Sequence, residues 1–194
     1  TIYLKKVFSG FVEISYTVPI KERTQTSMII FHPIPEEDVN HRINKGLFAK
    51  NAKVRDFSVK ILDKDEREDE VFKEKARVFY RMDFTDLGQL DGILLGSLFV
   101  RKKGNTLIVK REFKSVSFAP GPAPTPGEKK IYTESVRLLK DGFVHFRVVF
   151  PTASECRSNK GETSLGLLSY KLPLTDTVEK VGNKIWDFSI TTAY

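Results

Sequence analysis

Apolar and polar residues alternate along residues 74–84, and this alternation predicts a β-strand. From Ala76 onward one parity of the segment holds only apolar side chains, and charged side chains fill most of the other. A period of two is typical of a strand that has one face on a core and one in water. We therefore expect the apolar set to be buried: Ala76, Val78, Tyr80, Met82 and Phe84.

The same alternation recurs along much of the chain. It predicts further strands at residues 8–18, 54–62, 95–101, 106–113, 143–150, 168–172 and 186–194, with a short apolar strand at 28–31. Residues 103–105 form the turn between two of them, where Gly104 and Asn105 supply left-handed conformations. The parity also predicts that Val144, Phe146, Val148, Trp186 and Phe188 are buried, and that Arg77, His145 and Asp187 face solvent.

Helical spacing appears in a few segments only. Val39, Ile43 and Leu47 recur every four residues after Pro35 and three acidic residues, which predicts a helix. Residues 131–140 predict a second helix, and 86–92 and 175–181 predict short helical turns. The sequence therefore predicts an α+β fold, a large and mostly antiparallel β-sheet covered by two or three helices.

The 194 residues are enough for one domain with a sizeable core. Residues 118–128 hold four prolines and two glycines, which indicates either an extended loop or a linker. We expect a single domain over residues 1–194; in the linker interpretation, sub-lobes 1–117 and 129–194 are joined by 118–128. No apolar run approaches the ~20 residues of a membrane-spanning helix.

The net charge of +7 is unevenly distributed. Residues 94–130 carry eight basic and two acidic side chains, which gives this segment a charge of +6. One interpretation is a solubilising surface. The other is a hairpin that contacts an anionic surface through basic residues, namely Arg101, Lys102, Lys103, Lys110, Arg111 and Lys114.

Nucleic-acid binding is a weaker interpretation of this charge. Readers of single strands need exposed aromatic residues among basic ones. Phe79, between Arg77 and Arg81, is one such group, and Phe113 beside Arg111 and Lys114 is a second. We expect Phe79 to pack under a helix or a loop, and we expect no specific nucleic-acid partner.

Side chains that could support catalysis or bind a metal show no recognisable pattern. His32, His41 and His145 have no ligand spacing, and the acidic run 63–70 lacks the glycine of a calcium loop. Cys156 and His145 could in principle pair as nucleophile and base, but Cys156 lies in a polar turn without a catalytic signature. The glycines follow no phosphate-loop pattern. We expect no enzyme activity, cofactor or metal.

The order of the segments resembles exported bacterial lipoproteins of the LppM type and their uncharacterised relatives. The similar segments are GFVEISYTVP, V-FYRMDFTDLGQLDG, DGFVHFRVVFP, SNKGE and LSYKLPL, which together extend over most of the chain. The resemblance implies an acylated domain anchored in the cell envelope, with no catalytic residues. It also implies a lipid-bearing cysteine at the N-terminus, which this sequence does not contain, and we expect such a cysteine to precede Thr1.

These observations together predict a non-enzymatic, lipoprotein-like domain of the cell envelope, exported and lipid-anchored. Its expected partner is an anionic lipid surface or an envelope protein. One alternative is a cytoplasmic module that binds nucleic acid or another protein. A second alternative is an enzyme whose site is assembled from scattered residues.

Overall fold

The computed structural model of the protein describes residues 1–5, 8–19, 35–44, 54–62, 75–93, 96–113, 126–127, 133, 142–174 and 184–192. These residues form two β-sheets, one α-helix and one 3-10 turn. The seven-stranded sheet has the order β3 (Val54–Leu62), β4 (Lys75–Phe84), β2 (Gly10–Pro19), β1 (Ile2–Leu4), β7 (Phe143–Val149), β10 (Leu167–Pro173) and β9 (Glu162–Ser164). The four-stranded sheet has the order β5 (Ser97–Lys103), β6 (Thr106–Phe113), β11 (Lys184–Thr191) and β8 (Glu155–Ser158).

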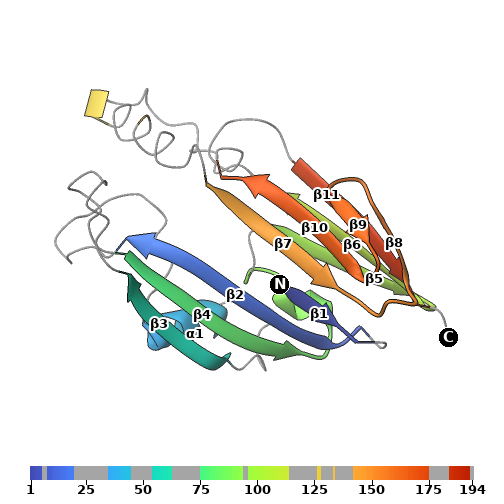
Figure 1. Ribbon diagram of the computed structural model, residues 1–194, viewed down its shortest axis with the longest axis horizontal. Helices are drawn as coiled ribbons and strands as arrows, with labels where there is room; N and C mark the ends of the chain where they lie inside the picture. Colours follow the sequence, from blue (N-terminus) through green and yellow to red (C-terminus); the bar gives the residue numbers. More distant parts are fainter. Residues whose placement is uncertain are drawn as a thin grey trace.

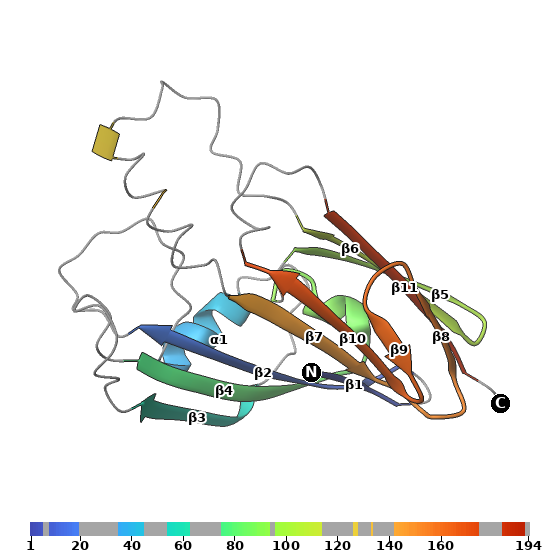
Figure 2. The same ribbon diagram turned by 45° about the horizontal axis from the view of Figure 1, so that its top comes forward.

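The two sheets form separate layers (Figure 1). The four-stranded sheet covers the half of the larger sheet that contains β7 and β10, and the helix α1 (Glu36–Asn44) lies against the half that contains β2 and β4 (Figure 2). The 3-10 turn η2 (Leu87–Leu90) follows β4, and its Asp86 and Gln89 form a capping box. Among the described residues, no helix is long and apolar enough to cross a membrane.

Neighbouring strands are antiparallel with one exception. β1 pairs antiparallel with β2, where Ile2 lies opposite Val12, and parallel with β7, where Ile2 lies opposite Val148. β1 thereby joins the N-terminal strands to strands from the C-terminal third of the chain.

A single hydrophobic core lies between the two layers. It contains Val39 and Ile43 of α1 together with apolar side chains of both sheets. The Trp186 ring of β11 lies 5.5 Å from the Phe146 ring of β7 and 4.9 Å from the Tyr170 ring of β10, as measured between ring centroids. Aromatic contacts therefore connect the sheets directly.

The buried faces predicted for β4, β7 and β11 are largely confirmed, whereas Val59 and Ile61, on the apolar parity of β3, are exposed. Every side chain on the apolar parity of β4 is buried, and so are Phe146, Val148, Trp186 and Phe188. Val144 is only partly buried against the core, because it lies near one end of β7. Arg77, His145 and Asp187 are exposed, as expected.

The predicted α+β fold with two or three covering helices is wrong. The described part of the chain is mostly β-sheet, with α1 as its one α-helix and η2 as its one 3-10 turn. The physical reason is that β5, β6, β8 and β11 form a second sheet with an apolar face of its own. This sheet covers much of the core that we assigned to helices.

Several predicted segments lie outside the described residues. These are the strand at 28–31, the acidic run 63–70, the helical turn at 175–181, and all but Thr133 of the helix at 131–140. Of the segment 118–128, only Pro126 and Gly127 are described, so the division into sub-lobes stays a prediction.

Candidate functional site

The β5–β6 hairpin carries the basic residues that the sequence singled out. Its strands pair from Ser97 opposite Glu112 to Lys103 opposite Thr106, and Gly104 and Asn105 form a two-residue turn. Gly104 has a φ of 57°, whereas Asn105 does not have a positive φ. A glycine at the first central position is typical of a type II′ turn, so the turn needs one left-handed residue rather than two.

The three consecutive basic residues at the tip are exposed. Arg101, Lys102 and Lys103 all face solvent as β5 approaches the turn. Lys102 differs from its neighbours because its Nζ lies 5.5 Å from the centroid of the Phe8 ring. Phe8 is itself buried, so the Lys102 side chain lies against the edge of the core. Arg101 and Lys103 share the outward parity of Phe99, whereas Lys102 shares the inward parity of Leu98, so the tip carries positive charge on both faces of the hairpin.

Arg111 does not belong to this surface, and its assignment as a contact residue is wrong. Its side chain is 1% exposed, on the same parity of β6 as Leu107, Val109 and Phe113. Its guanidinium carbon lies 4.6 Å from the Phe146 ring centroid and 5.5 Å from that of Phe113. Burial lowers the pKa of Arg111 to about 9, although the charge of Asp91 acts in the opposite direction.

The two other predicted residues of the descending arm differ from the tip residues. The Lys110 ammonium lies 2.8 Å from the Glu112 carboxylate, and this hydrogen bond, with the charge of Glu112, raises the pKa of Lys110. Its charge is thus partly neutralised. Lys114 lies outside the described residues.

Two apolar residues on the outer face of the hairpin were missed by the sequence prediction. Phe99 is 54% exposed and Ile108 is 41% exposed. Phe99 lies opposite Lys110, and Ile108 lies opposite Arg101, so each apolar side chain faces a basic one across the hairpin. The signal was present in the sequence, because both residues have the parity opposite to the buried Leu98, Leu107 and Val109.

We call the outward-facing residues Phe99, Arg101, Lys103, Ile108 and the half-buried Lys110, together with Lys102 at the tip, the hairpin patch. It combines apolar area with cations and contains no acidic side chain, although Glu112 adjoins Lys110. Such a surface is suited to an amphipathic partner, whose anionic groups meet the cations and whose apolar groups meet Phe99 and Ile108.

The remaining candidate residues do not converge. Within the described ranges, no group of three or more His, Cys, Asp or Glu side chains lies together in a way that could hold a metal ion. Cys156 of β8 packs against the core, and burial raises the pKa of its thiol to about 11. His145 is exposed on the other sheet, where its Nε2 lies 2.8 Å from Ser169 Oγ. The structure therefore does not pair Cys156 with His145.

Comparison with solved structures finds a weak similarity to the folded domain of LppM from Mycobacterium tuberculosis. The TM-score is 0.46 at 17% identity, over 100% of this chain and 86% of that domain. At this level the similarity carries no conclusion about function. Comparison with curated proteins finds no match. The family model described as LIC11874-like matches residues 1–194, and the chain therefore belongs to the LIC11874-like family.

Proposed function

We propose that this protein is a non-enzymatic domain of the cell envelope that contacts an anionic lipid surface through its hairpin patch. The observation that carries the proposal is the exposure of Phe99 and Ile108 among Arg101, Lys102 and Lys103 on one projecting hairpin. Exposed apolar residues beside cations favour the boundary between lipid headgroups and acyl chains.

The cations supply attraction to the surface. Each basic residue close to an anionic bilayer contributes about 1 kcal/mol. Arg101 and Lys103 contribute most, because Lys110 is paired with Glu112 and Lys102 has the inward parity and lies against the Phe8 ring. Arg111, which is buried, has no part in the contact.

Phe99 and Ile108 add a hydrophobic contribution to the electrostatic attraction. Transfer of apolar area from water contributes roughly 25 cal/mol per Å². Phe99 and Ile108 each retain about half of their area in water, and insertion between headgroups would remove it. The combined contact is weak by the standards of stable anchoring, which needs two attachments.

A lipid anchor would supply the second attachment. The resemblance of several segments to exported lipoproteins of the LppM type supports an envelope location with an acylated N-terminus. In this arrangement the anchor holds the domain at the membrane, and the hairpin patch fixes how the domain is oriented there.

Single-stranded nucleic acid is the competing ligand for the same patch. An exposed aromatic ring near basic side chains is what such binding uses, and Lys110 Nζ lies 6.0 Å from the Phe99 ring centroid. The nucleic acid would stack on the ring, whereas a bilayer would take up both Phe99 and Ile108.

The test is vesicle co-sedimentation of the protein tethered through an N-terminal histidine tag to nickel-bearing lipid. Vesicles of neutral lipid and of 30% anionic lipid are compared at low and high salt. We expect a larger membrane-contacting fraction, read from the fluorescence of a dye at position 105, on anionic vesicles. This difference should fall at high salt, because exposed charges are screened over ~8 Å at physiological ionic strength.

Two variants, each with a matched control, separate the contributions. Changing Arg101, Lys102 and Lys103 to Gln should remove the anionic preference, whereas changing Lys5, Lys60 and Arg157 to Gln alters the charge equally at other exposed sites. The double variant Phe99→Ser and Ile108→Ser should reduce insertion, whereas Phe143→Ser changes an equally exposed phenylalanine on the other sheet.

Two results would overturn the proposal. One is equal contact with neutral and anionic vesicles that no hairpin variant changes. The other is binding of a single-stranded oligonucleotide that depends on Phe99 but not on Ile108, without preference for anionic vesicles.

A further inference from the structure

Five side chains form a cluster on the outer face of β7 and β10. They alternate along the two strands with buried core residues, and they are Phe143, His145, Arg147, Ser169 and Lys171. The four-stranded sheet covers the opposite face of these two strands (Figure 2). Both strands are described over their whole length. We call this group the β7–β10 cluster.

Strand pairing brings the polar members of the cluster within reach of one ligand. His145 lies opposite Lys171, and Arg147 lies opposite Ser169. Opposite residues of an antiparallel pair have Cβ atoms about 5 Å apart, and the next outward row lies about 7 Å along the strand. His145 Nε2 lies 2.8 Å from Ser169 Oγ, which connects the two rows. Four groups that can donate hydrogen bonds therefore surround an area that one anion would fill.

The β7–β10 cluster carries two positive charges and contains no acidic side chain. Arg147 and Lys171 are both exposed. Burial lowers the pKa of His145, and the charges of Lys171 and Arg147 lower it further. Both cations therefore act on the same place, and their combined field favours an anion there.

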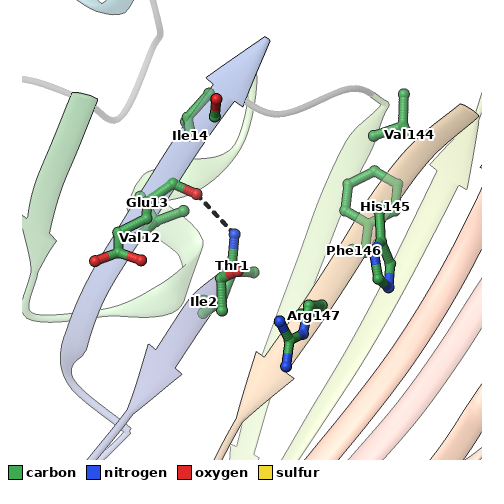
Figure 3. A pocket seen from close by; sticks show the side chains of 10 residues that line it. Thr1, Ile2, Val12, Glu13, Ile14, Val144, His145, Phe146 and Arg147 are labelled. Atoms are coloured by element: carbon green, nitrogen blue, oxygen red, sulfur yellow. Dashed lines mark hydrogen bonds between the residues drawn. The ribbon is translucent and has the colours of Figure 1, made fainter. Parts of the chain in front are cut away.

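Among the described residues, two acidic side chains adjoin the cluster in the strand register. Glu162 of β9 lies opposite Ser169, on the side away from Arg147. Figure 3 shows the carboxylate of Glu13 of β2 pointing away from Arg147. Burial and then the hydrogen bond with Glu13 raise the pKa of Tyr3, so this carboxylate is engaged on β1. An anion is therefore favoured between the two cations rather than over β9.

Phe143 adds an aromatic surface at one end of the cluster. Its side chain is 53% exposed. The centroid of its ring lies 5.1 Å from Lys171 Nζ and 6.4 Å from the centroid of the His145 ring. A ring attached to the anion can pack on Phe143 while the anion itself meets Lys171.

We propose that the β7–β10 cluster binds a phosphomonoester whose organic part lies on the Phe143 ring. A phosphomonoester carries a charge of about −1.5 to −2 at pH 7 and three acceptor oxygens. Arg147 and Lys171 balance this charge, and the planar guanidinium offers paired donors to two oxygens. The Ser169 hydroxyl donates to the third. The site is independent of the hairpin patch, which lies on the other sheet.

The test is a titration of the full chain with phenyl phosphate, followed by NMR through the imidazole signal of His145. The variant His145→Gln identifies this signal among those of the three histidines. We expect the pKa of His145 to rise in the complex, because a nearby negative charge favours the protonated ring. This measurement uses the unaltered protein, so it does not depend on whether a variant folds.

Two further probes separate the parts of the ligand. Inorganic phosphate lacks the ring and should bind about fivefold more weakly than phenyl phosphate, which is the size of an aromatic contact. Phenyl sulfate keeps the ring but carries a single charge, and it should also bind about fivefold more weakly, which is the size of one exposed charge contact.

Protein variants locate the anion. Arg147→Gln and Lys171→Gln should each weaken the binding of phenyl phosphate about fivefold. The matched control is Lys110→Gln, because Lys110 Nζ lies 6.0 Å from the ring of the exposed Phe99 on the other sheet. This control repeats the lysine–phenylalanine contact without the rest of the cluster, and it should bind as the unaltered protein does. Circular dichroism establishes that each variant is folded.

A second pair of variants locates the organic part. Phe143→Ala should remove the preference for phenyl phosphate over inorganic phosphate. Phe99→Ala, which removes an equally exposed phenylalanine of the other sheet, should leave the preference unaltered. Glu162→Gln should strengthen the binding of both probes, since it removes the negative charge opposite Ser169.

Vesicles distinguish the two sources of this chemistry, a lipid headgroup and a soluble phosphomonoester. Phosphatidic acid presents a phosphomonoester, whereas phosphatidylglycerol presents a diester. A loss of binding in Lys171→Gln with phosphatidic acid alone would identify the lipid as the source. Equal vesicle binding of Lys171→Gln and the unaltered protein, with phenyl phosphate still bound at the cluster, would identify a soluble source.

Three results would overturn the proposal. The first is an His145 signal that phenyl phosphate does not change. The second is unaltered binding of phenyl phosphate by both Arg147→Gln and Lys171→Gln. The third is equal binding of phenyl sulfate and phenyl phosphate, which would mean that the cluster attracts any anion through its charge. None of these results bears on the hairpin patch, whose test uses other residues and vesicles.

Discussion

The guanidinium carbon of Arg111 lies 4.6 Å from the centroid of the Phe146 ring, and the two residues belong to different sheets. Phe146 also contacts Phe113 and Trp186, with ring centroids 5.6 and 5.5 Å away. A buried cation is costly unless its surroundings compensate, and aromatic faces provide part of that compensation. Arg111 is thus a core residue, which packs the two layers together through its long side chain.

We expect Arg111→Ala to lower the free energy of unfolding by about 2–4 kcal/mol, because it leaves a cavity between the sheets. Arg111→Met keeps most of the volume and removes the buried charge, so its cost should be below about 1.5 kcal/mol. Urea unfolding measures both changes. A cost for methionine as large as that for alanine would contradict this packing role and would assign the stability to the charge.

The neighbouring phenylalanines Phe146 and Phe143 provide a matched pair for the core. Phe146 is 7% exposed and Phe143 is 53% exposed, on the same strand. Phe146→Ala should cost roughly 3–5 kcal/mol. Phe143→Ala should stay within about 0.5 kcal/mol of the unaltered protein. Similar midpoints of thermal unfolding for the two variants would mean that β7 has another register.

The alternation of side chains was enough to place most strands and their buried faces. In β6, Leu107, Val109, Arg111 and Phe113 share one parity, and all are buried. We nevertheless assigned Arg111 to the surface, because charge was given more weight than parity. Parity alone would also have predicted that Phe99 and Ile108 are exposed, because both have the outward parity.

Other features depend on pairings that the local pattern does not contain. A strand of alternating residues fits either sheet, so the sequence did not reveal that β5, β6, β8 and β11 form a separate layer. β1 is three residues long, which is too short for a period to show. Its parallel pairing with β7 joins residues more than 140 positions apart in the sequence.

Gly10 tests the close approach of β1 to β2. A Cβ atom at this position would lie 1.8 Å from the Tyr3 carbonyl oxygen, so the two strands would have to separate. We expect Gly10→Ala to cost about 1–3 kcal/mol, as overpacking does. Ser9→Ala at the adjacent residue should be nearly neutral. Equal stability of the two variants in urea would show that β1 is not held in this register.

Cys156 should react slowly with alkylating reagents in the folded protein. Burial raises its pKa from an ordinary value of 9.0 to about 11. At pH 8 the thiolate fraction then falls about 100-fold, since each pKa unit is a factor of ten. Iodoacetamide labelling in buffer and in urea measures the ratio. Equal rates in the two conditions would contradict the burial.

The raised pKa of Cys156 also determines the direction in which the stability of the protein changes with pH. Below pH 9 the thiol is protonated in both states, and its contribution to stability is constant. Between pH 9 and 11 the unfolded chain loses the proton first, so stability should fall as pH rises. Cys156→Ser should lack this part of the slope. An unchanged slope in the serine variant would assign it to other groups.

The hairpin patch predicts different effects for single charge changes. Arg101 is exposed, whereas the Lys110 ammonium is 2.8 Å from the Glu112 carboxylate. Loss of about 1 kcal/mol predicts that Arg101→Gln weakens contact with anionic vesicles about fivefold. Lys110→Gln should weaken it less than twofold, because the charge of Lys110 is already partly neutralised. Glu112→Gln should strengthen contact, since it releases Lys110 and removes the negative charge beside it.

Titration of tethered protein with anionic vesicles at low salt measures all three variants. An equal loss for Arg101→Gln and Lys110→Gln, with no gain for Glu112→Gln, would mean that net charge rather than the geometry of the hairpin governs the contact.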